Sequence, residues 1–238
     1  MPERINRARR SAVFIDLDLL DYRKALDFQL ETLHSKMNQP LLEDRIFFVE
    51  HPSVFTLGKR GGLENLGVSR NFLREKNIDL VQTDRGGNIT YHGPGQAVLY
   101  PIVDLERNRL GVKEYVHGLE EIMKQTALAF NIPADRNPKN HGMWVENAKI
   151  GSVGISIKRG ISIHGLAMNI TPDLEPFSWI HPCGLSDISI TSIEKELVKS
   201  GSSCGPDTDT LSMDQIKTAF IQHFSTVFDY SIRKKETS

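Results

Sequence analysis

Residues 142–170 constrain the fold of this chain more than any other segment. They read GMWVENAKIGSVGISIKRGISIHGLAMNI, in which apolar residues alternate with small or polar ones and glycines stand at the breaks. Alternation with a period of two is typical of strands that bury one face, and glycine favours the turns that join them. The segment therefore predicts a meander of short antiparallel strands.

Strands and helices are predicted to alternate through the rest of the chain. Apolar runs typical of strands occupy residues 13–20, 45–51 and 97–105, and the last run is continuous enough to be buried. Apolar residues recur with the spacing of one helix face over residues 21–37, 112–132 and 212–228. Asp21 and Ser212 stand where the N-caps of the first and last of these helices are expected.

No boundary or internal repeat divides these elements, so residues 1–238 are predicted to form one α/β domain. Residues 1–12 are predicted to be a flexible, basic tail, because no apolar segment of a secretory signal follows them. Residues 199–210 are rich in serine, glycine and aspartate and are predicted to form a surface loop.

Charge and cysteine content limit the classes of function. The formal net charge is −1, so no overall field attracts nucleic acid or an anionic membrane surface. No apolar run approaches the ~20 residues that span a bilayer. The two cysteines, Cys183 and Cys204, indicate a reducing compartment in which both thiols stay free, and the predicted location is the cytoplasm.

The stretch RGGNITYHGPGQ, residues 85–96, places glycines on both sides of Tyr91 and His92. Glycine has no Cβ and adopts positive φ readily, so either backbone or a ligand can approach closely. A tight hairpin with a bulge would use the same residues, and His92 could equally be a hydrogen-bonded core histidine. The stretch is no nucleotide-binding fingerprint.

Cys183, in HPCGL, and Lys149, in AKIGSVGISI, are candidates for chemistry. Pro182 and Gly184 place Cys183 in a turn, where amides beside the thiol could donate to a developing oxyanion. The cysteine could instead be a small buried hydrophobe. Lys149 heads a strand-like run, where apolar neighbours would depress its pKa, and the alternative is a solvated lysine at a strand end.

His164 and Asn169 interrupt the apolar run SIHGLAMNI, either as site residues or as the polar positions of an alternating strand. No metal site is predicted, because the histidines and cysteines lack His-x3-His or Cys-x2-Cys spacing. The sequence also lacks the Gly-x-Ser-x-Gly elbow of a serine nucleophile. Each of these signals alone is too weak to assign a function, so the assignment depends on their order along the chain.

In that order the motifs resemble those of the lipoyl(octanoyl) transferases, the octanoyltransferases of lipoate assembly. The resemblance extends from about residue 19 to residue 228 and rests on DYRKALDFQ, VEHPSVFTLGKR, DRGGNITYHGPGQAVLYPIVDL, GMWVENAKIGSVGISI, HGLAMNITPDLEPFSWIHPCGL and ITSI. It implies the fold shared by lipoate and biotin protein ligases, a single α/β (α+β) domain with a central mixed β-sheet and flanking helices.

The resemblance also implies a catalytic Cys/Lys dyad, which falls on Cys183 and Lys149. The implied substrate pocket consists of Arg85, Gly86, Gly87, Tyr91, His92, Gly93, Gly151, Ser152, Val153, Gly154, His164, Gly165, Leu166, Ala167 and Asn169. His92 and His164 are expected to position the dyad rather than to act as primary catalysts. Some relatives carry a cysteine two residues after the lysine; Gly151 stands there, so nothing essential is expected of that position.

The implied donor is octanoyl-acyl carrier protein, and the implied acceptor is a lysine on a lipoyl domain of the 2-oxoacid dehydrogenase complexes or on the glycine cleavage H protein. Thiolate chemistry suits this transfer because thioester exchange is nearly isoenergetic, and an ammonium beside the sulfur lowers the pKa of the thiol. No cofactor, nucleic acid or membrane partner is expected.

Three other functions remain open on the sequence. An ATP-dependent lipoate or biotin protein ligase would share the fold, but it does not need a cysteine at the position of Cys183. A non-catalytic module that binds lipoyl domains or acyl carriers would not need Cys183 and Lys149 together. A cysteine peptidase is disfavoured, because no histidine follows Cys183 at the separations such enzymes use.

Overall fold

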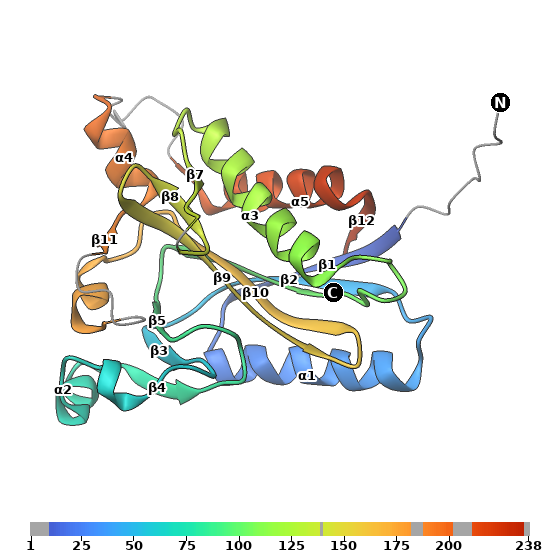
Figure 1. Ribbon diagram of the computed structural model, residues 1–238, viewed down its shortest axis with the longest axis horizontal. Helices are drawn as coiled ribbons and strands as arrows, with labels where there is room; N and C mark the ends of the chain where they lie inside the picture. Colours follow the sequence, from blue (N-terminus) through green and yellow to red (C-terminus); the bar gives the residue numbers. More distant parts are fainter. Residues whose placement is uncertain (1–9, 139, 182–187, 202–210, 236–238) are drawn as a thin grey trace.

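The computed structural model describes residues 10–138, 140–181, 188–201 and 211–235. A nine-stranded mixed sheet has the order β12-β1-β2-β6-β10-β9-β8-β7, with β11 paired to β9. Its strands are β1 (Arg10–Leu19), β2 (Asp44–Glu50), β6 (Gln96–Ile102), β7 (Asp135–Arg136), β8 (Met143–Val145), β9 (Ala148–Lys158), β10 (Ile161–Asn169), β11 (Ser189–Ile190) and β12 (Tyr230–Lys234). Figure 1 shows this sheet between layers of helices.

Helices cover both faces of the sheet. α1 (Tyr22–Asn38) packs on one face, while α3 (Val112–Ala129) and α5 (Met213–Phe228) pack on the other, as Figure 1 shows. The Asp21 carboxylate accepts from the first amides of α1, and Ser212 accepts from the amide of Gln215 in α5. These caps satisfy amides that have no partner within the helix, and both predicted N-caps are confirmed. Shorter helices are α2 (Arg70–Glu75) and α4 (Ile193–Lys199).

The apolar core around the nine-stranded sheet lies in two layers that follow its two faces. On the face of α3 and α5, Leu119, Phe220 and Phe224 pack on sheet residues such as Leu99 and Leu166. The layer beneath α1 consists of Tyr22, Ala25, Leu33, Phe47, Val49, Val54, Val81, Val98, Tyr100, Ile102, Ile161, Ile163 and Ala167. Because successive residues of a strand face opposite sides, β6 and β10 contribute to both layers.

A second, three-stranded sheet has the order β4-β3-β5, with β3 (Val54–Leu57), β4 (Asp79–Gln82) and β5 (Ile89–His92). The stretch 85–96 is therefore no simple hairpin, because β5 pairs with β3 whereas β6 pairs with β2 and β10. Residues 93–95 connect the two sheets. Gly95 makes this possible with a φ of +84°, and its amide donates to Glu50 Oε2 at 2.8 Å.

The fold class predicted from the sequence is confirmed as a mixed sheet with flanking helices. β8, β9 and β10 form the predicted antiparallel meander. The strand β1 begins at Arg10, so residues 10–12 belong to the sheet and not to a tail. Parallel pairing of Arg10 with Tyr230 and hydrogen bonds from its guanidinium to the carbonyls of Phe228 and Asn108 hold this end in place.

α3 ends at Ala129, before the end at residue 132 that the apolar spacing predicts. Asn131 adopts a φ of +58°, and the amide of Ile132 donates back to the carbonyl of Ala127, which closes the last turn. The predicted loop over 199–210 overlaps the end of α4 at Lys199, and its residues 202–210 lie outside the described part of the chain. Within the described residues, no helix is long and apolar enough to cross a membrane.

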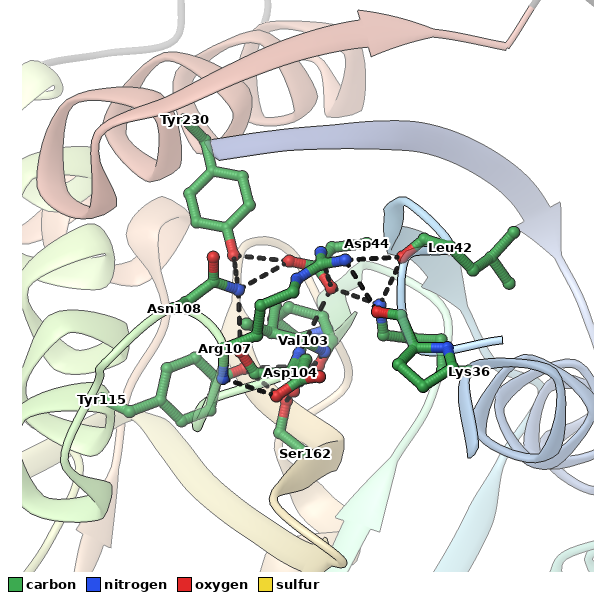
Figure 2. Close-up of polar contacts among 12 residues, drawn as sticks. Lys36, Leu42, Asp44, Val103, Asp104, Arg107, Asn108, Tyr115, Ser162 and Tyr230 are labelled. Carbon is green, nitrogen blue, oxygen red and sulfur yellow. Dashed lines mark hydrogen bonds and ion pairs between the residues drawn. The ribbon is translucent and has the colours of Figure 1, made fainter. Parts of the chain in front are cut away.

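A buried polar network joins the edge of the sheet to its neighbours, and Figure 2 shows Asp44 at its centre. Lys36 Nζ lies 2.6 Å from Asp44 Oδ1, with both side chains essentially inaccessible to solvent. The Asp44 carboxylate also accepts from Tyr230 Oη at 2.7 Å and from Asn108 Nδ2 at 2.9 Å. These contacts tie β12 to β2 and to the loop after β6, since a buried charge requires several compensating partners.

Candidate active site

A cavity of about 1220 Å³ lies against β9 and β10. Its described lining consists of Tyr22, Arg60, Arg85, Gly86, Gly87, Asn88, Ile89, Thr90, His92, Val98, Tyr100, Val112, Lys113, Val116, His117, Glu120, Asn140, His141, Lys149, Ser152, Val153, Gly154, Ile155, His164, Gly165, Leu166, Ala167, Phe177, Ser178, Ile180, His181 and Ile188. The sheet, the segment 85–92 and the N-terminal half of α3 thus share one cavity.

Four small residues of the lining pair with one another across β9 and β10. Ser152 lies opposite Ala167, and Gly154 lies opposite Gly165. Residues directly opposite in an antiparallel pair share a face of the sheet, so these small residues lie together on one face of the two strands. At Gly165 a Cβ would meet the carbonyl oxygen of Leu99 at 2.0 Å, so only glycine fits there.

The RGG segment, residues 85–87, packs on β9 and forms one wall of the cavity. The Gly86 amide donates to the carbonyl of Ile155 at 2.8 Å, and a Cβ at Gly154 would lie 3.1 Å from the Gly86 carbonyl oxygen. Arg85 is almost fully buried, and its guanidinium donates to the carbonyl and the hydroxyl of Thr56 at 2.7 and 2.8 Å. The glycines therefore allow the backbone to lie directly on the strand, while Arg85 anchors the segment to β3.

His92 belongs to a cluster of buried rings under α1. Its ring stacks on Tyr22 with centroids 5.9 Å apart, and it lies edge-on to His51 at 5.8 Å. The Nδ1 atom of His92 is 2.6 Å from Gln96 Oε1, while His51 Nε2 is 2.9 Å from Tyr100 Oη. With its ring held in this way, His92 forms part of the wall of the cavity. The neighbouring rings of Tyr22, His51 and Tyr100 were not predicted as part of the site.

Burial gives this cluster a specific pH dependence. Loss of hydration lowers the pKa of His51 from 6.5 to about 4 and that of His92 to about 3. Both rings therefore stay neutral in the folded protein at pH values where the unfolded chain binds protons. As the pH falls from 6.5 towards 4, the free energy of unfolding is expected to fall by roughly 1.4 kcal/mol per pH unit for each histidine.

Urea unfolding at pH 7, 6 and 5 measures this dependence. We expect the His92→Gln variant to lose part of the slope, whereas His34→Gln, at an exposed position on α1, keeps all of it. A free energy of unfolding that is the same at pH 7 and pH 5 would contradict the expectation.

His164 has a left-handed backbone within β10, with a φ of +60°. Its amide donates to Gln29 Oε1 of α1 at 2.8 Å, and its Nε2 lies 2.8 Å from Asp84 Oδ1. Asp84 in turn pairs with Lys158 at 2.6 Å. Burial lowers the pKa of His164 while the carboxylate opposes that effect. Because Asp84 accepts from Nε2, the Nδ1 atom is left as an acceptor in the wall, and it has no hydrogen-bond partner among the described residues.

Lys149 lies at the start of β9 and lines the cavity. Its Nζ lies 5.6 Å from the centroid of the Trp144 ring, a cation–π distance. Strand β11 pairs beside it, and the amide of Thr191 donates to the Lys149 carbonyl at 3.0 Å. Cys183, the other predicted member of the dyad, lies outside the described residues, as does Cys204.

Most of the predicted pocket residues lie together in the cavity lining, whereas Tyr91, Gly93, Gly151 and Asn169 do not. Tyr91 turns into the core beside β3, where its hydroxyl bonds Ser53. A Cβ at Gly151 would lie 2.5 Å from Met123 Sδ, so this glycine faces α3. Asn169 donates to the carbonyl of Thr191 and accepts from Gln96. Tyr91, Gly151 and Asn169 therefore contact residues that lie outside the cavity lining.

Comparison with known proteins places this chain in a family. The model of the lipoyl protein ligase A/B catalytic domain matches residues 21–225. An octanoyltransferase of Desulfotalea psychrophila is 46% identical over 76% of this chain and 82% of its own length. An octanoyltransferase of Nitratidesulfovibrio vulgaris is 39% identical over 91% of this chain and 94% of its own. The chain belongs to the octanoyltransferase family. The resemblance of its motifs to this family is thereby confirmed.

Solved structures of more distant proteins share the fold of this octanoyltransferase-family chain. Lipoate-protein ligase A, bound with ATP, aligns with a TM-score of 0.74 over 97% of this chain and 90% of its own, at 14% identity. A bipartite lipoate protein ligase of Thermoplasma acidophilum aligns with a TM-score of 0.69 over 96% and 88%, at 16% identity. These likenesses confirm the lipoate protein ligase fold and carry no conclusion about activity.

Proposed function

We propose that this chain transfers an octanoyl group from octanoyl-acyl carrier protein, through a thioester on Cys183, to the lysine of a lipoyl domain. The cavity beside Lys149 carries this proposal, because an apolar part of its lining and a lysine that can support thiolate chemistry share one cavity. Family membership supports the reaction class. Acceptors would be the lipoyl domains of 2-oxoacid dehydrogenase complexes or the glycine cleavage H protein.

The shape of the cavity suits a straight acyl chain. Val98, Leu166 and Ala167 line it with apolar surface. Burial of each methylene contributes about 0.8 kcal/mol, so a chain of six methylenes gains roughly 5 kcal/mol. Binding sites for small molecules measure roughly 300–1,000 Å³. The cavity volume thus leaves room for the arm of the donor or the side chain of the acceptor.

The first step would load the enzyme. The thiolate of Cys183 would attack the carbonyl carbon of the donor thioester, so that a new carbon–sulfur bond forms and the carbon–sulfur bond to the carrier breaks. The departing carrier thiolate would take the proton of the Lys149 ammonium, which leaves Lys149 neutral for the second step. An unperturbed thiol is mostly protonated near neutral pH. The Lys149 ammonium would stabilise the thiolate, and backbone amides near Cys183 would hold the oxyanion. The role of Cys183 is carried over from the motif HPCGL.

The second step would transfer the acyl group to the acceptor. The acceptor lysine attacks the acyl-enzyme carbonyl as the neutral amine, the amide bond forms, and the Cys183 thiolate leaves. Lys149 would take up the proton that the acceptor amine releases. His92 and His164 would hold the walls beside these steps. No cofactor enters this scheme, and its free thiol suits a reducing compartment such as the cytoplasm.

Intact-mass measurement after incubation with octanoyl-acyl carrier protein tests this function. We expect the protein to gain one octanoyl group, which hydroxylamine removes and which Cys183→Ala does not acquire. Addition of an apo lipoyl domain should discharge the group without ATP. An acyl-enzyme that persists in Cys183→Ala would contradict the assignment of the nucleophile, and an absolute requirement for ATP would favour a ligase.

A further inference from the structure

We propose that Glu120, Gly142 and Trp144 form a frame that positions Lys149, and that Glu120 fixes this frame to α3. This role rests on the proposed function, in which Lys149 is the catalytic lysine. The three residues form the Lys149 frame: Glu120 lies in α3, Gly142 directly precedes β8, and Trp144 lies in β8. Glu120, Gly142 and Trp144 are therefore positioning residues that act through Lys149.

Gly142 is the point at which this frame touches the lysine. Its φ is +118°, a conformation that residues with a side chain rarely adopt. A Cβ there would lie 2.7 Å from Lys149 Cε and 3.3 Å from Lys149 Nζ, and 2.4 Å from the carbonyl oxygen of Gly151. The backbone at 142 thus lies directly against the end of the lysine side chain. A displacement of the Gly142 backbone would therefore displace the Lys149 ammonium that packs against it.

Glu120 holds the backbone at 142 in this place. Its Oε1 accepts from the Gly142 amide at 3.0 Å, and only 5% of the residue is exposed. Burial of this bond makes it costly to lose, because the amide would remain without a partner. A helix provides a rigid support, and α3 is anchored in the core through Leu119 and Ile122 on either side of Glu120. Glu120 also lines the cavity.

Trp144 is the third residue of the frame, and its ring also contacts Lys149. Lys149 Nζ lies 5.6 Å from its ring centroid, and the indole Nε1 donates to the Asn140 carbonyl at 3.0 Å. That bond fixes the orientation of the ring, and the ring face attracts the ammonium form of the lysine. Trp144 also lies opposite Lys149 in the pairing of β8 with β9. The lysine is thus flanked by a ring and by a backbone segment.

The charges around Glu120 indicate that its role is geometric rather than electrostatic. Arg136 Nε lies 3.3 Å from Glu120 Oε2, and His141 Nδ1 lies 3.6 Å from Oε1. Lys113 and His117 line the cavity from the same helix. A carboxylate that already pairs with a guanidinium exerts little net field on a second cation. The hydrogen bond to Gly142 is therefore the contact through which Glu120 acts on the lysine.

Two substitutions at Glu120 separate the hydrogen bond from the charge. Glu120→Gln keeps an oxygen that can accept from Gly142 but removes the charge, and Glu120→Ala removes both. Glu121→Ala is the matched control, because Glu121 also pairs with Arg136, at 2.6 Å, but its other hydrogen bond is to Gln125 and not to Gly142. Thermal unfolding of each variant identifies any loss of folded protein.

We expect Glu120→Ala to lower the rate of acyl-enzyme formation about 10- to 100-fold, with little change in KM for the octanoyl donor, because a small displacement of a catalytic group costs that much. Glu120→Gln should recover to within about threefold of the wild type, as should Glu121→Ala. The alkaline limb of the pH–rate profile, which would report the Lys149 proton, should move by about half a pH unit or less towards acid in both Glu120 variants.

Trp144 provides a second test that does not involve α3. Trp144→Phe keeps a ring beside the ammonium and should lower the rate no more than about threefold, whereas Trp144→Leu should lower it about tenfold. In Trp144→Leu the alkaline limb should move towards acid, since the ring no longer favours the ammonium. A merely structural role of the tryptophan would leave that limb in place.

The outcomes distinguish this inference from the proposed function. A wild-type protein that acquires no octanoyl group shows that the proposed function is wrong. A wild type that is loaded normally, together with a Glu120→Ala variant of equal rate, overturns the frame alone. An equal loss of rate in Glu120→Gln and Glu120→Ala would also overturn it, because the charge and not the hydrogen bond would then matter.

Discussion

Acyl transfer is expected to fall by about a thousandfold when Lys149 is replaced with alanine, while the protein remains folded. Proton transfer by a positioned side chain contributes typically 10²- to 10⁴-fold, and the lysine also stabilises the thiolate in the proposed mechanism. Lys149 is half-buried at the head of β9 and contributes to the cavity rather than to the apolar core. Its loss should therefore affect chemistry much more than stability.

Two half-reactions measured separately give the most information. Loading of Cys183 from octanoyl-acyl carrier protein and discharge to an apo lipoyl domain should both be slow in Lys149→Ala. Lys24→Ala, which removes an exposed lysine from α1, should leave both rates within about twofold of the wild type. A Lys149→Ala variant that retains a tenth or more of the wild-type rate in both steps would remove the lysine from the mechanism.

Replacing Asp44 with alanine is expected to lower the free energy of unfolding by about 3–5 kcal/mol. The substitution leaves the Lys36 ammonium buried, because its side chain is only 1% exposed and its other bond is to the Leu42 carbonyl. It also leaves Tyr230 Oη and Asn108 Nδ2 without their shared acceptor. Figure 2 shows these groups converging on the one carboxylate. Urea unfolding followed by circular dichroism measures the loss.

Two further variants decide whether burial of the charge is the cause. Asp135→Ala breaks the exposed pair with Lys124 and should cost less than about 1 kcal/mol. The double variant Asp44→Leu with Lys36→Met removes both buried charges and should be more stable than Asp44→Ala alone, because no ion is left without a partner. If Asp44→Ala costs no more than Asp135→Ala, the network contributes little to stability.

The predictions that held depend on short-range patterns. Alternation over residues 142–170 predicted β8, β9 and β10, and the apolar spacing predicted α1, α3 and α5. The apolar periodicity was less informative at the ends of helices and strands and in short strands. It extended α3 past Ala129 and placed residues 10–12 in a tail, because it contains no information on the distant residues that pair there. The strands β3, β4 and β5 were not predicted for the same reason.

The residues of the candidate site also divide into those with a local sequence signal and those that only the fold identifies. Lys149, Arg85, Gly86, Ser152 and their neighbours were named from motifs, and the structure brings them into one lining. Glu120, Gly142 and Trp144 were not singled out. Glu120 carries no distinguishing signal within its helix, where a second glutamate follows it. Its proposed role depends on the hydrogen bond from the Gly142 amide, which is 22 residues away along the chain.

The sequence by itself determined the alternation of strands and helices, the helix caps and the family motifs, because each of these depends on residues close together in the chain. Only the tertiary structure decided that Asp44 meets Tyr230, 186 residues away, and that Ser152 and Gly154 pair with Ala167 and Gly165 in the wall of the cavity. Register between strands sets which small residues lie side by side. Periodicity within one strand cannot specify it.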